Sequence, residues 1–250
     1  MSAVVDEYLE TIYNVTMEGD PVIAARLAQK FGVSAPNVAA ILQRMEHDGL
    51  VTRDDRKIVQ LTGTGRALAE AALRRHRLSE RFLGEVLGLD WITAHEEAHH
   101  LEHGLTPEIE ARIDAVLGHP TTCPHGNPIP GGVPDATDYL RDQQAFRLSQ
   151  ARHGQPLRVV CVSEVVEDES TLLRYVGQKG IRPGATLIVR EREPGGALSI
   201  DLGAKMVAVG VDLANKVWVR SAADEAQVAG GDGSGTPDHT LRALGYDGAR

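Results

Sequence analysis

The segment 118–135 divides the chain into two parts of different character, because it holds five prolines and four glycines. Such a composition interrupts helices and strands alike, so we expect a hinge here. Before it, apolar residues recur at helical spacing, whereas after it short runs of β-branched residues alternate with turns. With 250 residues the chain is long enough for two or three domains. The sequence therefore predicts a mainly α-helical chain with a β domain at its C-terminal end.

Three helical patterns followed by two β-like runs fill the beginning of the chain. Gly32 lies in the short turn before the third pattern, Ser34 is the expected cap of that helix, and Pro36 stands in its first turn. Helices joined by such a turn and followed by a hairpin are typical of a winged helix-turn-helix. The expected elements cover residues 8–15, 23–31, 35–48, 50–53 and 58–62.

The charge distribution singles out the same region. The whole chain has a formal charge of −9, which argues against an indiscriminate nucleic-acid binder. Residues 24–81, however, hold 11 Lys and Arg against 6 Asp and Glu. A concentrated basic segment is what a DNA-contacting surface needs, although a solvated arginine-rich helix face would have the same composition.

The periodicity of the remaining chain completes a division into five parts. Further helices are expected over 63–86, 91–104, 106–117 and 136–152, and β runs at 157–162, 186–190, 198–202 and 217–220. The predicted parts are a winged helix-turn-helix at 1–65, a helical domain at 66–135, a linker at 136–155, a small β barrel at 156–220 and a flexible tail at 221–250.

Cysteine content and hydropathy indicate the compartment. The two cysteines, Cys123 and Cys161, are too few for a disulfide framework. No apolar run approaches the ~18 residues that a spanning helix needs. The first residues are acidic, where a secretory signal would be basic. We therefore expect a cytoplasmic protein with no membrane partner.

Seven of the ten histidines fall within residues 76–125. On a continuous helix, four side chains of the densest stretch would share an arc of roughly 100°. Two other helical patterns carry polar pairs at helical spacing, and folding can bring groups from separate helices together. Imidazoles and carboxylates are ligands for divalent metal ions, so the pattern predicts a metal site. The shared arc holds His95, His99, Glu102 and His103, and the pairs are His76 with Glu80 and Glu7 with Glu10.

Two alternatives compete with a regulatory metal site. A lone His is most often part of a solvated polar face, but four such groups on one stripe make that reading less favourable. The run His95-Glu96-x-x-His99 also matches the pattern of zinc peptidases, in which the Glu is a general base. The extended version of that motif needs a further His where this chain has Leu105. A zinc-dependent hydrolase is therefore the remote alternative, and we expect no enzyme.

Six motifs give the chain a resemblance to a known family, the diphtheria-toxin-repressor type of metal-dependent transcriptional regulators. The resemblance extends over residues 4–220 and implies a winged helix, a helical dimerisation and metal-binding domain, and a C-terminal SH3-like domain. The motifs are Glu7-Tyr8-Leu9-Glu10-Thr11-Ile12-Tyr13, Arg44-Met45-Glu46-His47-Asp48-Gly49-Leu50-Val51, Leu61-Thr62-x-x-Gly65-Arg66, Arg75-His76-Arg77-Leu78-x-Glu80-Arg81, His95-x-Glu97-Ala98-x-x-x-Glu102-His103 and Gly126-Asn127-Pro128-Ile129-Pro130-Gly131.

The resemblance implies two sets of metal ligands. The regulatory site would use Glu7, His99, Glu102 and His103. Glu10 and His76 match positions that bind the second metal of manganese-type members. An ancillary site of iron-type members matches His76, Glu80 and His95, completed by an acidic residue of the SH3-like domain, either Glu169 or one of Glu164 and Glu167.

The ligand types bear on which metal is bound. Iron-type members have Met and Cys where this chain has Glu7 and His99, and manganese-type members have a bridging carboxylate at the place of His99. A carboxylate and an imidazole in place of sulfur favour a harder cation. Mn(II) is therefore the first prediction and Fe(II) the alternative, while other divalent transition metals should bind in vitro.

The implied function is a homodimeric, metal-dependent repressor that controls metal-homeostasis genes through an inverted-repeat operator in double-stranded DNA. The start of the third helix would reach base edges, and basic side chains around it would contact phosphates. The expected base-reading residues are Ser34, Ala35, Pro36 and Asn37. The expected phosphate contacts are Arg26, Arg44, Arg53, Arg56 and Lys57.

Overall fold

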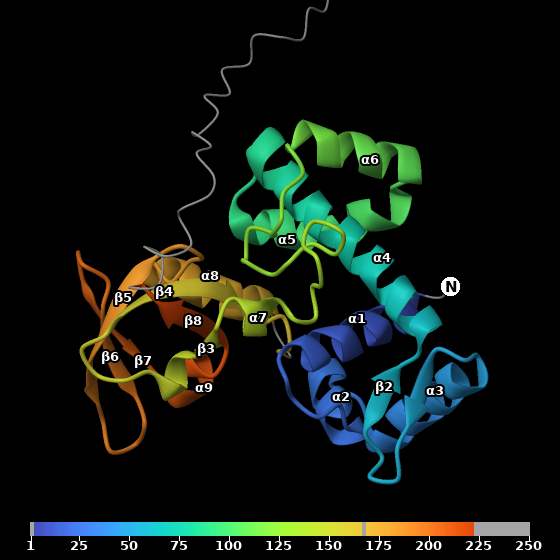
Figure 1. The fold of residues 1–250 in the computed structure, drawn as a ribbon, viewed down its shortest axis with the longest axis horizontal. Helices are drawn as coiled ribbons and strands as arrows, with labels where there is room; N and C mark the ends of the chain where they lie inside the picture. Colours follow the sequence, from blue (N-terminus) through green and yellow to red (C-terminus); the bar gives the residue numbers. More distant parts are fainter. Residues whose placement is uncertain (1–2, 167–168, 223–250) are drawn as a thin grey trace, which may run out of the picture.

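The computed structural model describes residues 3–166 and 169–222, and the predicted tail lies outside this range apart from its first two residues. Its N-terminal part has the expected order of three helices and a hairpin (Figure 1). The hairpin strands are antiparallel, with Val51 opposite Leu61. The elements are α1 (Ala3–Met17), α2 (Ala24–Phe31), α3 (Ala35–His47), β1 (Val51–Arg53) and β2 (Val59–Leu61).

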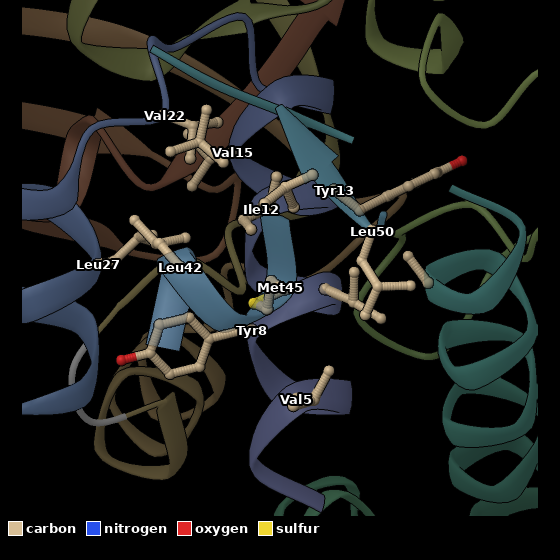
Figure 2. Packing of buried hydrophobic residues seen from close by; sticks show 14 of the residues in the cluster. Val5, Tyr8, Ile12, Tyr13, Val15, Val22, Leu27, Leu42, Met45 and Leu50 are labelled. Atoms are coloured by element: carbon tan, nitrogen blue, oxygen red, sulfur yellow. The ribbon is translucent and has the colours of Figure 1, made fainter. Parts of the chain in front are cut away.

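A core shared by the three helices orients α3. Figure 2 shows Ile12, Leu42 and Met45 pointing into the space between the helices, and all three are fully buried. Gly32 ends α2 in the left-handed conformation, with φ 60°, and so allows the sharp turn into α3. Ser34 occupies the N-cap position of α3, but its side chain makes no capping hydrogen bond, which corrects that expectation.

The helical middle part begins with α4 (Gly63–Arg81), the long helix that leads away from the hairpin (Figure 1). The expected helix through residue 86 instead changes into a π-helical turn over Phe82–Val86, and Gly88, with φ 74°, follows it. The helix expected over 91–104 ends earlier, because its last turn tightens into a 3-10 turn over Glu102–Gly104. The other helices here are α5 (Trp91–Leu101) and α6 (Pro107–Val116).

The segment 118–135 is packed against its neighbours, in contrast to the expected hinge. Ile129 is fully buried with Leu78 of α4. Gly126 has φ 87°, and a Cβ at this position would lie 2.1 Å from the carbonyl oxygen of Val160. Glycine therefore lets this loop contact the first long strand of the C-terminal domain.

An antiparallel six-stranded sheet in the order β3-β8-β4-β5-β6-β7 forms the C-terminal domain. The helix expected over 136–152 shrinks to α7 (Tyr139–Asp142), and part of the expected linker supplies strand β3 (Phe146–Arg147). The strand β7 was not expected. The remaining elements are β4 (Pro156–Val162), α8 (Glu169–Lys179), β5 (Thr186–Arg192), β6 (Leu198–Asp201), β7 (Met206–Val209), α9 (Val211–Ala214) and β8 (Val217–Ser221).

The C-terminal domain is docked on the N-terminal three-helix part. Arg147 of β3 donates to Glu18 at 3.3 Å and to Asp20 at 2.8 Å, just beyond the end of α1. The hydroxyl of Ser163 donates to the same Glu18. Val165 belongs to the hydrophobic core of the three N-terminal helices. These contacts place residues of the C-terminal domain beside α1.

Candidate metal centre

A cavity of about 460 Å³ lies where α1, α4, α5 and the C-terminal domain meet. Acidic side chains enter it from α1 and from the C-terminal domain, whereas imidazoles enter it from α4 and α5. The helical spacing of these residues explains the convergence, because side chains at i and i+4 share a helix face. Its ionisable lining includes Glu7, Glu10, Lys30, His76, His95, His99, Glu164 and Glu169.

Three imidazoles form the centre of this cavity. Each of His76, His95 and His99 offers one ring nitrogen, and these nitrogens all lie within 4.8 Å of one another. The ring centroids of His76 and His99 are 4.5 Å apart, and those of His95 and His99 are 5.1 Å apart. Imidazoles at this spacing are able to ligate a metal ion in their neutral form.

Two buried carboxylates orient the imidazoles. Glu80 Oε1 lies 2.7 Å from His95 Nδ1 and 3.3 Å from His76 Nε2. Glu102 Oε2 lies 2.7 Å from His76 Nδ1. Burial by itself would lower the pKa of His76, but Glu80 and Glu102 outweigh that effect and raise this pKa well above its usual value. Without a cation, these groups compensate one another's charge.

The electrostatics of the cavity fit a cation. Although part of the His99 side chain is exposed, desolvation of its ring by the surrounding protein, with His76 and His95 adding to it, lowers its pKa to about 4. This imidazole is therefore neutral at pH 7 and able to ligate. Burial also raises the pKa of Glu10 to about 8, and Glu102 contributes in the same direction. Carboxyl groups that are crowded in this way are stabilised in their ionised form by a positive ion.

The predicted ligands at the edge of the cavity are placed differently. Glu7 lines the cavity but is exposed on α1. His103 is 55% exposed and lies 3.5 Å from Glu102 Oε1, because the 3-10 turn after α5 changes the direction of its side chain. Glu169 begins α8 with Oε1 3.9 Å from His95 Nε2. The structure therefore gathers the predicted ligands around His76, with Glu7 and His103 at the periphery.

Sequence reasoning missed two residues beside this cavity and named a third only as an alternative. His125 Nδ1 lies 3.1 Å from Glu80 Oε1, and Cys123 is buried next to it. Glu164 accepts from Arg77 at 2.6 Å and from Asn14 at 2.9 Å. The available signal was the run Cys123-Pro124-His125 directly before the Gly126-Asn127-Pro128 motif, inside a segment interpreted as a hinge.

The arrangement around Glu96 does not support the hydrolase alternative. Glu96 is half-exposed and lies 3.8 Å from Arg174 of α8. It takes no part in the cluster of His76, His95 and His99. A general base has to reach the metal-bound water, so a carboxylate directed toward Arg174 lacks the required position.

The predicted DNA-contacting residues are mostly exposed. Residues 34–37 at the start of α3 are all exposed, as are Arg44 and the hairpin-turn residues Arg56 and Lys57. In Figure 1 α3 and the hairpin lie on the side of their domain away from the C-terminal sheet. Arg53 is paired with Glu46. Arg26 is bound to Asp20 at 2.7 Å, in a groove that Arg147 and Lys216 also line, so it faces the C-terminal domain.

Each part of the chain matches a described sequence family. Residues 1–59 match "Iron dependent repressor, N-terminal DNA binding domain", residues 62–131 match "Iron dependent repressor, metal binding and dimerisation domain", and residues 146–221 match "FeoA domain". Within the described residues no helix has the length and apolar character needed to cross a membrane.

Relatives match over nearly their whole length. The iron-dependent repressor IdeR of Mycobacterium tuberculosis is 38% identical over 221 residues, which cover 85% of this chain and 94% of the relative. The diphtheria toxin repressor of Corynebacterium diphtheriae is 34% identical over 218 residues, with the same coverage of 85% and 94%. A solved manganese-dependent transcriptional repressor in complex with manganese is 33% identical with a TM-score of 0.71, covering 87% of this chain and 99% of that one. The manganese regulator SloR is 26% identical with a TM-score of 0.71, covering 88% and 100%.

Fold, site and relatives together define a metal-dependent, DNA-binding transcriptional repressor with a DNA-binding domain, a dimerisation domain and an SH3-like C-terminal domain. The chain belongs to the family of iron-dependent repressors that includes the diphtheria toxin repressor. This family consists of transcriptional repressors and not of enzymes, so the prediction of a non-enzymatic protein is confirmed.

Proposed function

We propose that a homodimer of this chain represses metal-homeostasis genes when a divalent cation occupies the cavity between α1, α4 and α5. The observation that carries the proposal is the convergence of His76, His95 and His99 opposite the carboxyl groups of α1. Because α1 belongs to the DNA-binding domain and α4 and α5 to the dimerisation domain, groups that bind one ion from both sides would fix the spacing of the two α3 helices. Such a dimer fits an inverted-repeat operator with half-sites one helical turn, or a multiple of it, apart.

The chain's own residues prepare the cavity. Glu80 and Glu102 orient the imidazoles, and His99 needs no deprotonation at pH 7. When bound, a divalent cation would take over the compensation of the carboxylate charge from the protonated imidazoles. The proposed regulatory ligands are Glu7, His99, Glu102 and His103, and the proposed ancillary ligands are Glu10, His76, Glu80, His95 and Glu169.

Apolar side chains on the dimerisation domain support association of two copies. Leu87 is 57% exposed and Val116 62% exposed, and Val86 and Ile109 are exposed as well. Large exposed apolar residues gathered on one domain are typical of surfaces that a partner covers. The exposed residues of α3 would then enter the major groove, with base contacts from residues 34–37 and phosphate contacts from Arg44, Arg56 and Lys57.

Fe(II) and Mn(II) are the two candidates for the bound cation. The curated relatives carry the name of iron-dependent repressors, and this supports Fe(II), the alternative of the sequence prediction, better than Mn(II). Mn(II) is the second candidate, because the described residues that line the cavity offer carboxylates and imidazoles but no sulfur, and oxygen-rich sites suit the harder cation. A manganese-dependent repressor among the similar structures agrees with this reading.

Fluorescence anisotropy tests the proposal with an inverted-repeat promoter fragment under anaerobic conditions. We expect binding with Fe(II) or Mn(II) and its loss with a chelator, and titrating each metal separately ranks the two candidates. The variant Glu102→Ala should stay folded and lose the metal response. Glu96→Ala is the matched control, because Glu96 lies on α5, the helix that leads into the 3-10 turn of Glu102, but faces Arg174. Equal affinity with and without chelator would show that no metal switch exists.

A further inference from the structure

A second group of metal-ligating side chains lies behind the cavity, in the fully buried space between α4 and the loop 122–130. Glu80, Cys123 and His125 each offer one ligand atom, and these atoms lie within 4.8 Å of one another. His125 Nδ1 is 3.1 Å from Glu80 Oε1 and 3.8 Å from Cys123 Sγ. Each of the three residues is about 1% exposed or less. The group therefore combines one nitrogen, one sulfur and one oxygen donor away from solvent.

Two polar atoms of this group lack a partner within the described part of the chain. Both Glu80 Oε2 and His125 Nε2 are buried without a hydrogen bond. An unsatisfied buried carboxylate oxygen costs free energy, so native proteins rarely leave one without a bound water or ion. Glu164 Oε1 lies 4.0 Å from Cys123 Sγ, while its other oxygen accepts from Arg77. A fourth donor is thus within reach.

The backbone holds Cys123 and His125 in place before any ion is bound. The amide of Gly126 donates to the carbonyl of Cys123 at 3.0 Å, which closes a tight turn. The carbonyl of His125 accepts from the amide of Val162 at 3.0 Å, and this fixes the turn to β4. The rings of Trp91 and His125 form an edge contact with their centroids 4.7 Å apart. A turn that is fixed on several sides positions ligands at little further entropic cost.

We propose that Glu80, Cys123 and His125 form a second metal site for a borderline divalent cation of the zinc type, next to the regulatory cavity. A thiolate together with an imidazole and a carboxylate suits Zn(II), Co(II) or Fe(II) better than Mn(II). On loading, the thiol of Cys123 releases its proton to solvent and a metal–sulfur bond forms. Because Glu80 Oε1 also faces His76 and His95, its carboxylate would connect this site to the cavity. The site is independent of the proposed function except for the shared Glu80.

Cobalt spectroscopy of the metal-free full chain tests this site. Titration with Co(II) alone should produce a near-ultraviolet thiolate-to-cobalt charge-transfer band with the intensity of one thiolate ligand per chain. The band should vanish in Cys123→Ser and persist in Cys161→Ser, since Cys161 is the other fully buried cysteine and lies outside the group. A wild-type protein without the band, or a Cys123→Ser variant that keeps it, would overturn the proposal.

A second measurement needs no variant and so does not depend on how Cys123→Ser folds. Zn(II) should slow alkylation of Cys123 in the wild-type chain several-fold, as followed by peptide mass mapping, because a metal-bound thiolate is shielded. Alkylation of Cys161 should stay unchanged. Equal rates for Cys123 with and without Zn(II) would contradict the site. Operator binding of the same wild-type sample is measured separately. Metal-activated operator binding without a thiolate band would contradict the second metal site but not the proposed function.

Discussion

Arg77 holds three parts of the molecule together through one buried guanidinium group. It is fully buried and donates to Asn14 Oδ1 of α1 at 2.8 Å and to Glu164 Oε2 at 2.6 Å, as well as to the carbonyl of Pro128. Removing one partner of a buried ion pair leaves the other charge without compensation, which costs about 3–5 kcal/mol.

Arg77→Met should therefore lower the free energy of unfolding by about 3–5 kcal/mol, as measured by urea denaturation of the metal-free protein. Arg112→Ala is the control, because Arg112 and Glu108 form a pair that is more than three-quarters exposed, and such pairs contribute about 0–1 kcal/mol. A similar small loss in both variants would mean that the buried contacts of Arg77 add no stability.

Glu10 contributes to the pH dependence of metal binding, together with His76, whose pKa is raised as well. Burial first, and Glu102 after it, raise the pKa of Glu10 to about 8, so the metal-free protein keeps this carboxyl protonated at pH 7. A cation binds the ionised form, hence binding releases the proton, and Mn(II) affinity should rise as the pH increases from 6 to about 8. His99, with its pKa lowered to about 4, releases no proton over this range.

Calorimetry in two buffers of different ionisation enthalpy measures this proton release at pH 7. Glu10→Gln should reduce the number of protons released by close to one and flatten the rise in affinity between pH 6 and 8. Unchanged proton release in Glu10→Gln would assign the proton to another group.

At the scale of helices and strands, the junction of α4 with the hairpin depends on Gly65. A Cβ on Gly65 would lie 1.9 Å from the carbonyl oxygen of Leu50, whereas a Cβ on Gly63 meets nothing within 4 Å. Thr62 caps α4 by accepting from the amide of Gly65 at 3.0 Å, so displacing the helix also strains this cap. A methyl group therefore does not fit at Gly65 without a shift of the backbone, whereas it fits freely at Gly63.

Gly65→Ala should lower the melting temperature clearly, because either the β1–β2 hairpin with Leu50 before it or the start of α4 has to move. Gly63→Ala should leave it unchanged or raise it, since Ala is favoured over Gly in a helix by up to about 1 kcal/mol. Thermal unfolding followed by circular dichroism compares the two variants. Equal melting temperatures would show that the contact with Leu50 relaxes at no cost.

Sequence periodicity predicts some of these helices and strands but not others. Helices α1 to α4 and the hairpin follow from apolar spacing, because their buried faces are local patterns. The stripe from His95 to His103 assumed one continuous helix, and the 3-10 turn moved His103 outward. Strand β3, only two residues long, exists through its pairing with β8. His125 was missed because its role depends on contacts with Glu80 and β4 that are distant in sequence.

At the scale of the whole molecule, the cavity is assembled from three parts of the chain, so docking of the C-terminal domain should affect metal affinity. Arg147 fixes this docking at the far end of α1, through Glu18 and Asp20. Glu18 is buried, and without Arg147 its carboxylate keeps the hydroxyl of Ser163 but loses its hydrogen-bonded cation. Glu164 and Glu169 line the cavity from the domain that Arg147 holds.

Arg147→Ala should therefore weaken Mn(II) binding by about 5- to 150-fold, the usual range of coupling between sites, although no ligand is altered. Isothermal titration measures the affinity, and Arg190→Ala is the control, because Arg190 pairs with Asp201 inside the C-terminal sheet, away from α1. Because coupling is reciprocal, bound Mn(II) should protect the wild-type contact between the domains against hydrogen exchange. Equal Mn(II) affinities of the two variants would mean that the metal site forms without the docked domain.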